Sequence, residues 1–293
     1  MKIDFYIAGI QKAGTTNLAY VLSKCSNIVT HPQMECTFFY DEKEYSKGNH
    51  FLEKNYFFDT PAHLNGSHYR LVKHSNSFTT IEALERVVKH SPDVKFILIF
   101  RNPLQRFVSS YLMEKTRSLY PNDLKKTIEI ALSDKNSFEH QVFYSFGKYD
   151  EWLKKILVKI NENQIHYFLF EDLYNDIEHH LEQFSKKYNL NIDTSVLSNL
   201  PVQNTQKEIK SNRYQKLIVK LRHSKIKENI RALIPVKFWV KLTKKLEHIN
   251  LVEPQEKFII DKDLENILAD NYYSSIKNFE AITGLKTNWL NGQ

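Results

Sequence analysis

The fold of this chain is decided close to its start, by residues 5–18, FYIAGIQKAGTTNL. The apolar run over 5–10 is typical of a buried parallel strand. Apolar residues then recur at helical spacing over 18–22, so a helix is expected to begin at the threonines that follow Gly14. Between the two, Gly9 and Gly14 allow a tight turn that brings backbone N–H groups against a ligand. The stretch therefore predicts a phosphate-binding turn that leads into the positive N-terminus of a helix.

The spacing G-x-x-x-x-G-T-T is close to the nucleotide-binding P-loop but differs from it in one respect. The P-loop places a lysine directly after the second glycine and then a Ser or Thr that holds Mg²⁺. Here Thr15 occupies the position of that lysine, and the lysine of this loop is Lys12. The turn therefore offers one cation and no evident metal-holding group. An ordinary strand-to-helix turn with two glycines remains an alternative.

A second motif lies at residues 94–111, VKFILIFRNPLQRFVSSY. Again an apolar strand ends at a polar turn, and Pro103 is well placed to open the next helix. Arg101 stands at the strand exit, and Ser109 falls about two turns into the helix. A guanidinium and a hydroxyl that converge beside a strand end suit a second phosphate. The alternative is a surface Arg-Pro turn followed by ordinary helix-face residues.

The two motifs, in this order, resemble those of the sulfotransferases that use 3′-phosphoadenosine-5′-phosphosulfate (PAPS), nearest the heparan-sulfate-type and related bacterial enzymes. The similarity runs along most of the chain and includes LVKHS at 71–75, GKY at 147–149, FLFEDL at 168–173 and the closing segment at 284–290. The resemblance implies a PAPS-dependent sulfotransferase (EC 2.8.2.-) whose product is adenosine 3′,5′-bisphosphate. No metal is expected.

The resemblance also implies where the cofactor binds. In that family the first loop grips the 5′-phosphosulfate, the second motif grips the 3′-phosphate, and a basic loop closes over the 3′-phosphate. Residues 210–213, KSNR, fit that basic loop loosely. The expected cofactor-binding residues are Gln11, Lys12, Ala13, Gly14, Thr15, Thr16, Asn17, Arg101, Ser109, Lys210, Ser211 and Arg213.

The expected catalytic residues are Glu35, Lys12, Lys73 and His74. Glu35 matches the glutamate that precedes a pair of aromatic residues in the resembled enzymes, and it would take the proton from an acceptor hydroxyl. The resemblance places Lys12 near the leaving oxygen and Lys73 near the transferring sulfonate. His74 stands where related sequences often have Thr or Ser, and its near-neutral pKa makes it a rival base. The choice between Glu35 and His74 stays open from the sequence.

Strands that alternate with helices predict an α/β fold, a single P-loop-like domain over 1–293 with a central parallel sheet and helices on both faces. A basic helical segment at about 205–250 is expected to lie within that domain. Other expected helices cover 81–90, 124–133, 147–160 and 261–282. A strand is expected over 166–170, with Asp172 as the cap of the helix after it.

Composition limits the chemical class of the ligands and the cellular compartment of the protein. The chain has 293 residues, 42% of them hydrophobic, which is enough to bury a sizeable core. Its net charge of +7 predicts anionic ligands, a class that includes PAPS, acidic glycans and nucleic acids. The resemblance favours a hydroxyl or amine acceptor, for which an acidic oligosaccharide is the candidate, and no nucleic-acid partner is expected. Two cysteines and the lack of a long apolar run predict a cytoplasmic protein without a membrane span.

Two other function classes compete with sulfuryl transfer. A P-loop-like nucleotide kinase would use the first loop, but the displaced lysine and the lack of a clear Walker-B carboxylate argue against it. A non-catalytic protein that binds polyanions through the basic segment would leave the paired phosphate motifs unexplained.

Overall fold

The computed structural model describes residues 1–57, 68–117, 120–190, 208–211, 213–216, 249–252 and 258–290. The chain divides into two compact units, which are described separately. Unit 1 comprises Met1–Arg106, Phe146–Gln203 and Ala269–Gln293, and unit 2 comprises Phe107–Ser145 and Asn204–Leu268. The single domain over 1–293 stays a prediction.

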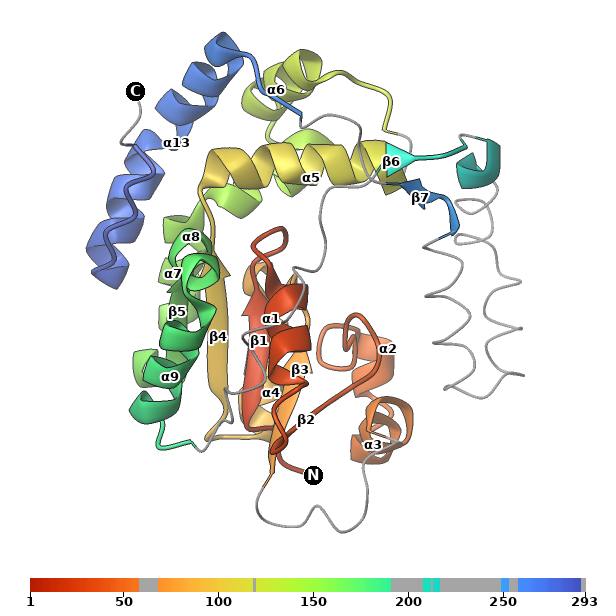
Figure 1. Ribbon diagram of the computed structural model, residues 1–293, viewed down its shortest axis with the longest axis vertical. Coiled ribbons are helices and arrows are strands. Elements are labelled where there is room, and N and C mark those ends of the chain that lie inside the picture. The colour runs from red at the N-terminus through yellow and green to blue at the C-terminus, as the bar shows by residue number, and fades with distance from the viewer. Residues whose placement is uncertain are drawn as a thin grey trace. The chain divides into compact units, whose positions relative to one another are not determined.

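Unit 1 is built on a five-stranded sheet with the strand order β2-β3-β1-β4-β5 (Figure 1). Every pair of neighbouring strands in it is parallel, and Phe5 on β1 lies opposite Leu71 on β3 and Lys95 on β4. The strands are β1 (Phe5–Gly9), β2 (Ile28–Thr30), β3 (Tyr69–Lys73), β4 (Lys95–Phe100) and β5 (Ile165–Leu169). The predicted central parallel sheet is confirmed.

Helices of unit 1 connect these strands. They are α1 (Thr15–Leu22), α2 (Glu42–Tyr45), α3 (Asn49–Tyr56), η1 (Ser77–Thr79), α4 (Ile81–His90), α7 (Tyr149–Leu157), η4 (Glu162–Gln164), α8 (Phe170–Asn175) and α9 (Ile177–Lys187). The long helix α13 (Lys262–Thr283) belongs to unit 1 from Ala269 onward.

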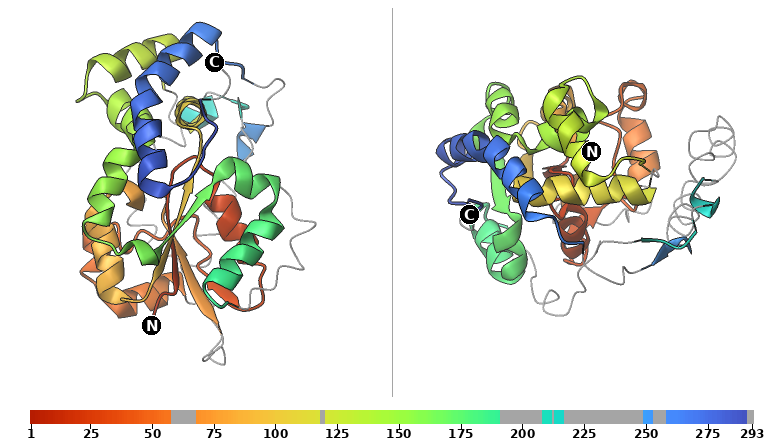
Figure 2. Two further views of the ribbon diagram at one scale, coloured as in Figure 1. Left: turned by 90° about the vertical axis from the view of Figure 1, so that its left-hand side faces the viewer. Right: turned by 90° about the horizontal axis from the view of Figure 1, so that it is seen from above.

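Both faces of the sheet are covered, as its edge-on view shows (Figure 2, left). The ring of Phe5 lies 5.5 Å from that of Phe184 on α9. The next residue, Tyr6, points to the opposite face because side chains alternate along a strand, and its ring lies 5.9 Å from that of Phe39. Phe100 of β4 packs on Phe279 of α13 with a ring distance of 4.6 Å. Burial on both faces explains why these strands read as continuous apolar runs.

Most element boundaries follow the sequence pattern, and one capping assignment is wrong. Helices α4 and α6 (Leu124–Ser133) have the predicted bounds, while α7 is shorter than expected. Asp172 lies inside α8 because that helix starts at Phe170, directly after β5. The capping carboxylate is Asp176, where the backbone leaves helical geometry and Oδ1 accepts a hydrogen bond from the backbone N–H of His179 at 3.1 Å.

Unit 2 contains most of α5 (Pro103–Arg117), α6, η2 (Glu139–Tyr144), the first turns of α13, and a short antiparallel pair of β6 (Glu208–Ile209) and β7 (Leu251–Val252). The short helix η3 (Ser145–Gly147) begins at Ser145, the last residue of the first segment of unit 2. Phe107 and Phe143 pack together with a ring distance of 5.8 Å. None of the helices in the described ranges combines the length and the apolar composition that crossing a bilayer requires.

Candidate active site

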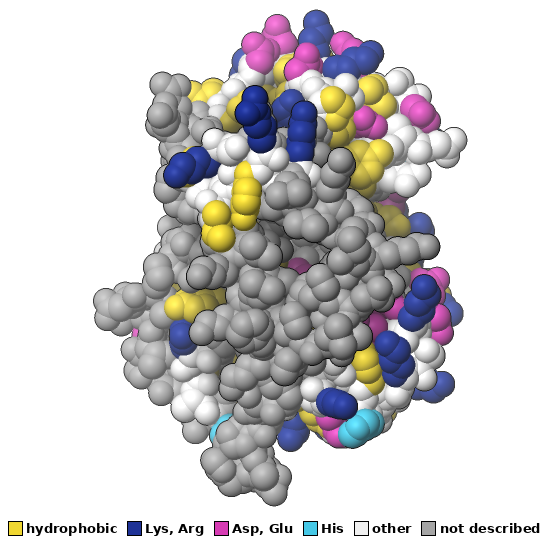
Figure 3. Space-filling model, turned by 90° about the vertical axis from the view of Figure 1, so that its right-hand side faces the viewer, with side chains coloured by type: hydrophobic (Ala, Val, Ile, Leu, Met, Phe, Trp, Pro, Cys, Tyr) yellow, Lys and Arg dark blue, Asp and Glu magenta, His cyan; other side chains and the backbone are white. Residues whose placement is uncertain are grey.

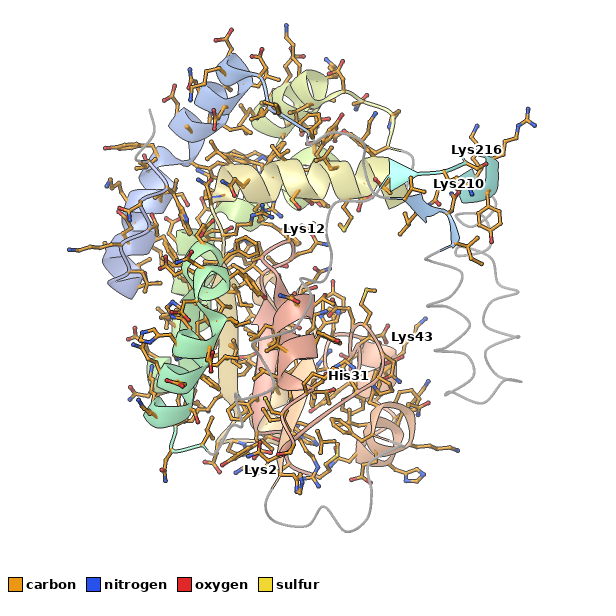
Figure 4. The ribbon with its side chains drawn as sticks, viewed as in Figure 1. Lys2, Lys12, His31, Lys43, Lys210 and Lys216 are labelled. Atoms are coloured by element: carbon orange, nitrogen blue, oxygen red, sulfur yellow. The ribbon has the colours of Figure 1, made fainter. Side chains whose placement is uncertain are left out.

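The first loop has the backbone geometry expected of an anion cradle. Gly14 takes the N-cap position of α1 with a left-handed φ of 80°, and no side chain caps the helix. The N–H groups of Thr15 and Thr16 therefore have no carbonyl partner within the helix, whereas that of Asn17 donates to the carbonyl of Gly14 at 2.9 Å. Such N–H groups at a helix N-terminus suit an anion. Lys12 also has a left-handed φ, 72°. It lies above the carboxyl end of β1, whereas Lys2 lies at the amino end of the sheet (Figure 4).

Gly14 is required for its lack of a side chain as well as for its backbone angle. A Cβ added there would lie 2.5 Å from Cε2 of Tyr174. The hydroxyl of the same tyrosine donates a hydrogen bond to the carbonyl of Gly14 at 2.7 Å. Tyr174, on α8, therefore holds Gly14 in place by a hydrogen bond and by filling the space beside it.

Arg101 connects the second motif to the first loop. Its Nη1 donates to the carbonyl of Lys12 at 3.1 Å, and its guanidinium lies 4.7 Å from the ring centre of Phe170. The hydroxyl of Tyr149 donates to the carbonyl of Arg101 at 2.8 Å. Among the described residues, the buried Nε of Arg101 has no hydrogen-bond partner. A half-buried guanidinium with an unused donor beside the first loop fits a phosphate ligand.

Glu171 fixes the turn that follows Arg101. Its Oε1 accepts from the backbone N–H of Asn102 at 2.9 Å, and its Oε2 accepts from Nε1 of Trp289 at 3.2 Å. The side chain of Asn102 accepts from the backbone N–H of Leu104 at 2.9 Å. The start of α5 is therefore held both locally and by the closing segment of the chain.

Glu35 forms an ion pair with Lys73 at the carboxyl end of β3. Nζ of Lys73 lies 2.7 Å from Oε1 of Glu35 and donates to the carbonyl of Met34 at 2.8 Å. Ser75 binds the same carboxylate twice, through its hydroxyl to Oε1 at 2.7 Å and through its backbone N–H to Oε2 at 2.9 Å. The carboxylate is thus held in one orientation by three donors.

These contacts determine the charge of Glu35. Burial by itself raises the pKa of the carboxyl group, but the Lys73 ammonium, His74 and the hydrogen bonds from Lys73 and Ser75 outweigh it, so the net pKa is lowered. Glu35 is therefore ionised at neutral pH and able to accept a proton.

Two histidines flank this pair, and both are uncharged at neutral pH. Burial lowers the pKa of His74 to about 4 and that of His31 to about 3, with Lys73 adding to both shifts. Nε2 of His31 accepts a hydrogen bond from the backbone N–H of Lys73 at 3.1 Å. The ring of His74 lies 4.2 Å from that of Tyr40.

The predicted site residues fall into two groups. Unit 1 brings together residues 11–17, Glu35, Lys73, His74 and Arg101, which follow strands β1, β2, β3 and β4; the carboxyl ends of such strands are where α/β sheets bind ligands. Ala13 and Thr15 are buried, so their contribution to the cradle is the backbone.

The second group lies in unit 2. Ser109 is on α5, while Lys210, Ser211 and Arg213 are exposed. Asn250 holds this segment by accepting from the backbone N–H groups of Lys210 and Ser211 at 2.8 and 2.9 Å. Contact of these four residues with the cofactor stays a prediction.

The sequence did not predict the hydrogen bond from Tyr174 to Gly14 or the hydrogen bonds from Ser75 to Glu35. Tyr174 is separated from Gly14 by 160 positions, and Ser75 from Glu35 by 40. The pattern of the sequence carries no signal for such pairs.

Residues 2–243 match the sulfotransferase domain family. The chain belongs to this family. The predicted family is confirmed, and PAPS-dependent transfer of class EC 2.8.2.- is the activity that this family implies. The match gives no support to the kinase or to the non-catalytic polyanion binder.

Individual relatives are distant. The chain is 27% identical over 168 residues to heparan sulfate glucosamine 3-O-sulfotransferase 5 of Mus musculus and to that of Homo sapiens, a match that covers 57% of this chain and 45% of each relative. The chain thus spans about half the length of these curated relatives.

Two solved structures share the fold. The sulfotransferase from Alicyclobacillus acidocaldarius matches with a TM-score of 0.64 and 15% identity, covering 99% of each chain. The sulfotransferase domain from the curacin biosynthetic pathway matches with a TM-score of 0.50 and 14% identity, covering 93% of this chain and 98% of that one. At this identity both confirm the predicted α/β fold alone.

Proposed function

We propose that this sulfotransferase transfers the sulfuryl group of PAPS to a hydroxyl of a glycan, by in-line displacement with Glu35 as the general base. The observation that carries the proposal is the ion pair of Glu35 and Lys73, fixed by Ser75 at the carboxyl end of β3. It provides an ionised, oriented carboxylate beside the carboxyl end of β3, the strand that neighbours β1 and the loop after β1.

The hydrogen bonds of Glu35 select the oxygen that takes the proton. Oε1 accepts from Lys73 and from the Ser75 hydroxyl, whereas within the described residues Oε2 accepts only from the backbone N–H of Ser75. A carboxylate oxygen accepts about two hydrogen bonds. Oε2 therefore has room for the proton of an acceptor hydroxyl.

The remaining residues would stabilise negative charge on the phosphate and sulfuryl oxygens. PAPS supplies an activated sulfuryl group whose bond to the 5′-phosphate breaks as the acceptor oxygen bonds to sulfur. The electron pair of the breaking bond stays on the phosphate oxygen, where the N-terminus of α1 and Lys12 would stabilise it. Lys73 would stabilise the sulfuryl oxygens while it holds Glu35. Arg101 would bind the 3′-phosphate.

The glycan hydroxyl is supported by similarity and by charge. Each of the two curated relatives is named as a glucosamine 3-O-sulfotransferase of heparan sulfate. The net charge of +7 favours an acidic acceptor. Described Lys and Arg side chains are visible at several places on the face seen in Figure 3, some of them beside Asp and Glu side chains.

The base is tested with Glu35→Gln, which keeps size and hydrogen bonding but cannot take a proton. We expect kcat to fall by about 10²–10⁴ while the dissociation constant for PAPS stays unchanged. Glu85→Gln is the matched control, because among the described residues Glu85 pairs with Lys159 alone, at 3.0 Å, and both side chains are exposed. Near-normal kcat in Glu35→Gln would remove Glu35 from the mechanism.

The acceptor is tested by comparing an acidic oligosaccharide with its uncharged analogue in an assay with labelled PAPS. We expect the acidic acceptor to have the higher kcat/KM, and this value to fall with added salt because ions screen the attraction. Efficient, salt-insensitive turnover of the uncharged analogue would exclude the acidic glycan.

A further inference from the structure

A buried hydrogen-bond chain leads from the core of the sheet to His74. The hydroxyl of Tyr6, on β1, lies 2.8 Å from Oγ of Ser77, and that Oγ lies 3.1 Å from Nδ1 of His74. All three side chains are buried. In the part of the chain that the structure describes, Ser77 is the hydrogen-bond partner of Tyr6, and no other residue contacts its hydroxyl in this way.

The direction of the chain follows from counting protons. Burial raises the pKa of Tyr6, so its hydroxyl keeps its proton and must donate it to Ser77 Oγ. In the part of the chain that the structure describes, Tyr6 and His74 are the hydrogen-bond partners of Ser77 Oγ, so the hydroxyl proton of Ser77 is satisfied only by donating to Nδ1 of His74. In the reverse direction the proton of Tyr6 would be buried without an acceptor, which native structures avoid. The chain therefore runs from Tyr6 through Ser77 to His74.

This direction fixes the tautomer of His74. A neutral imidazole carries one N–H, and the nitrogen that accepts a hydrogen bond is the one without the proton. Because Nδ1 accepts from Ser77, the proton of His74 is on Nε2, at the edge of the ring away from Ser77. Nε2 is thus a donor and has no lone pair with which to take a proton.

We infer that His74 acts as a neutral hydrogen-bond donor in the transfer site, presenting its Nε2–H to a sulfuryl oxygen, and that Glu35 alone receives the proton of the acceptor. The inference rests on the proposed function. The surroundings of His74 suit this role. Lys73 lowers the pKa of His74, Glu35 raises it, and the ring of Tyr40 packs on the imidazole. Ser75, one residue further on, binds Glu35.

With these roles, every proton and electron pair of the transfer step is accounted for. The acceptor proton moves to Glu35, the acceptor oxygen bonds to sulfur, and the electron pair of the breaking bond stays on the 5′-phosphate. No proton moves to or from His74. A neutral donor stabilises the charge on the sulfuryl group without competing with Glu35 for the acceptor proton.

Three variants at one position test this role. The amide of His74→Gln places an N–H near the position of Nε2, the shorter amide of His74→Asn reaches only the Ser77 side, and His74→Ala has neither. We expect His74→Gln to keep kcat within about tenfold, and the Asn and Ala variants to lose about 10²–10³. If His74 were the base, all three variants would be equally slow, because no amide takes a proton. That result would overturn the inference.

A second measurement does not depend on turnover. The ¹⁵N spectrum of histidine distinguishes a protonated from an unprotonated ring nitrogen, and the signals of His74 are those absent from His74→Gln. At pH 7 we expect a neutral ring with its proton on Nε2. A proton on Nδ1 would overturn the inference even if the enzyme is active. The expected tautomer in a protein without sulfotransferase activity would instead identify the proposed function as the part that failed.

Discussion

The two ends of the parallel sheet each carry a pair of a lysine and a carboxylate, and they differ in their surroundings. At the amino end Lys2 lies 3.1 Å from Asp93, with side chains 53% and 79% exposed. At the carboxyl end Lys73 lies 2.7 Å from Glu35, with side chains 3% and 29% exposed. The first pair is an isolated surface contact, whereas Ser75 and the carbonyl of Met34 complete the second.

This difference shows why one charged pair is a candidate for catalysis and the other is not. Water and salt screen an exposed pair, which contributes little. A desolvated pair interacts more strongly and persists only where further hydrogen bonds satisfy both groups. The carboxyl ends of β1 and β3 provide this second setting, beside the N-terminus of α1. The predictions below test how far the contrast between the two ends extends.

The largest effect is expected from Lys73→Met, which removes the ammonium but keeps the length of the side chain. We expect kcat to fall by about 10²–10³, because a preorganised charge at the reacting group is lost. The acidic limb of the pH–rate profile should also move to higher pH, since Lys73 lowers the pKa of Glu35. Lys2→Met is the control at the other end of the sheet. An unchanged acidic limb would show that Glu35 is not the group that titrates.

The next effect concerns Arg101, which joins the second motif to the first loop. Loss of a charge-assisted contact costs about 1.5–3 kcal/mol, so Arg101→Ala should weaken PAPS binding by about tenfold to a hundredfold. Calorimetric titration with adenosine 3′,5′-bisphosphate measures this directly. Arg101→Lys should be intermediate, because it keeps the charge but loses the planar fork. A normal dissociation constant in Arg101→Ala would contradict the assignment to the 3′-phosphate.

A different kind of effect, on stability rather than on binding or turnover, is expected at acid pH. The pKa of His74 is lowered to about 4 and that of His31 to about 3, so below the ordinary histidine pKa the unfolded chain binds more protons than the folded chain. The free energy of unfolding should therefore fall as the pH drops below about 6.5, by about 1.4 kcal/mol per pH unit for each histidine. Glu35, whose pKa is also lowered, adds to the loss at still lower pH.

Urea unfolding between pH 7 and pH 4 measures this dependence. His74→Gln should show a shallower slope than the parent protein, because one buried group that resists protonation is gone. A variant with the same slope would show that His74 is protonated equally in both states.

The smallest effect is expected at the amino end. Asp93→Asn removes one partner of the exposed pair with Lys2, and such pairs contribute little in water. The melting temperature and kcat should both stay within experimental error. A clear loss of either would mean that the two ends of the sheet do not differ as the exposure of their side chains indicates.

The sequence by itself determined the local elements and the family. The apolar run of β1, the glycines of the first loop and the spacing of α1 were readable because strand, turn and helix each depend on residues close together in the chain. The bounds of α4 and α6 followed for the same reason. By resemblance, the motifs also predicted Glu35, Lys73 and Arg101 as residues of the site, which stays a prediction.

Only the tertiary structure shows the surroundings on which the proposed roles of these residues depend. Sequence reasoning left Glu35 and His74 as rival bases, and the contacts that separate them join distant positions: Lys73 to Glu35 over 38 residues, and Tyr6 to Ser77 over 71. The same holds for Tyr174 behind Gly14. The pKa and the tautomer of a side chain depend on its neighbours in space and on its burial. The order of residues along the chain does not show these neighbours. They meet only when the parallel strands bring their carboxyl ends together.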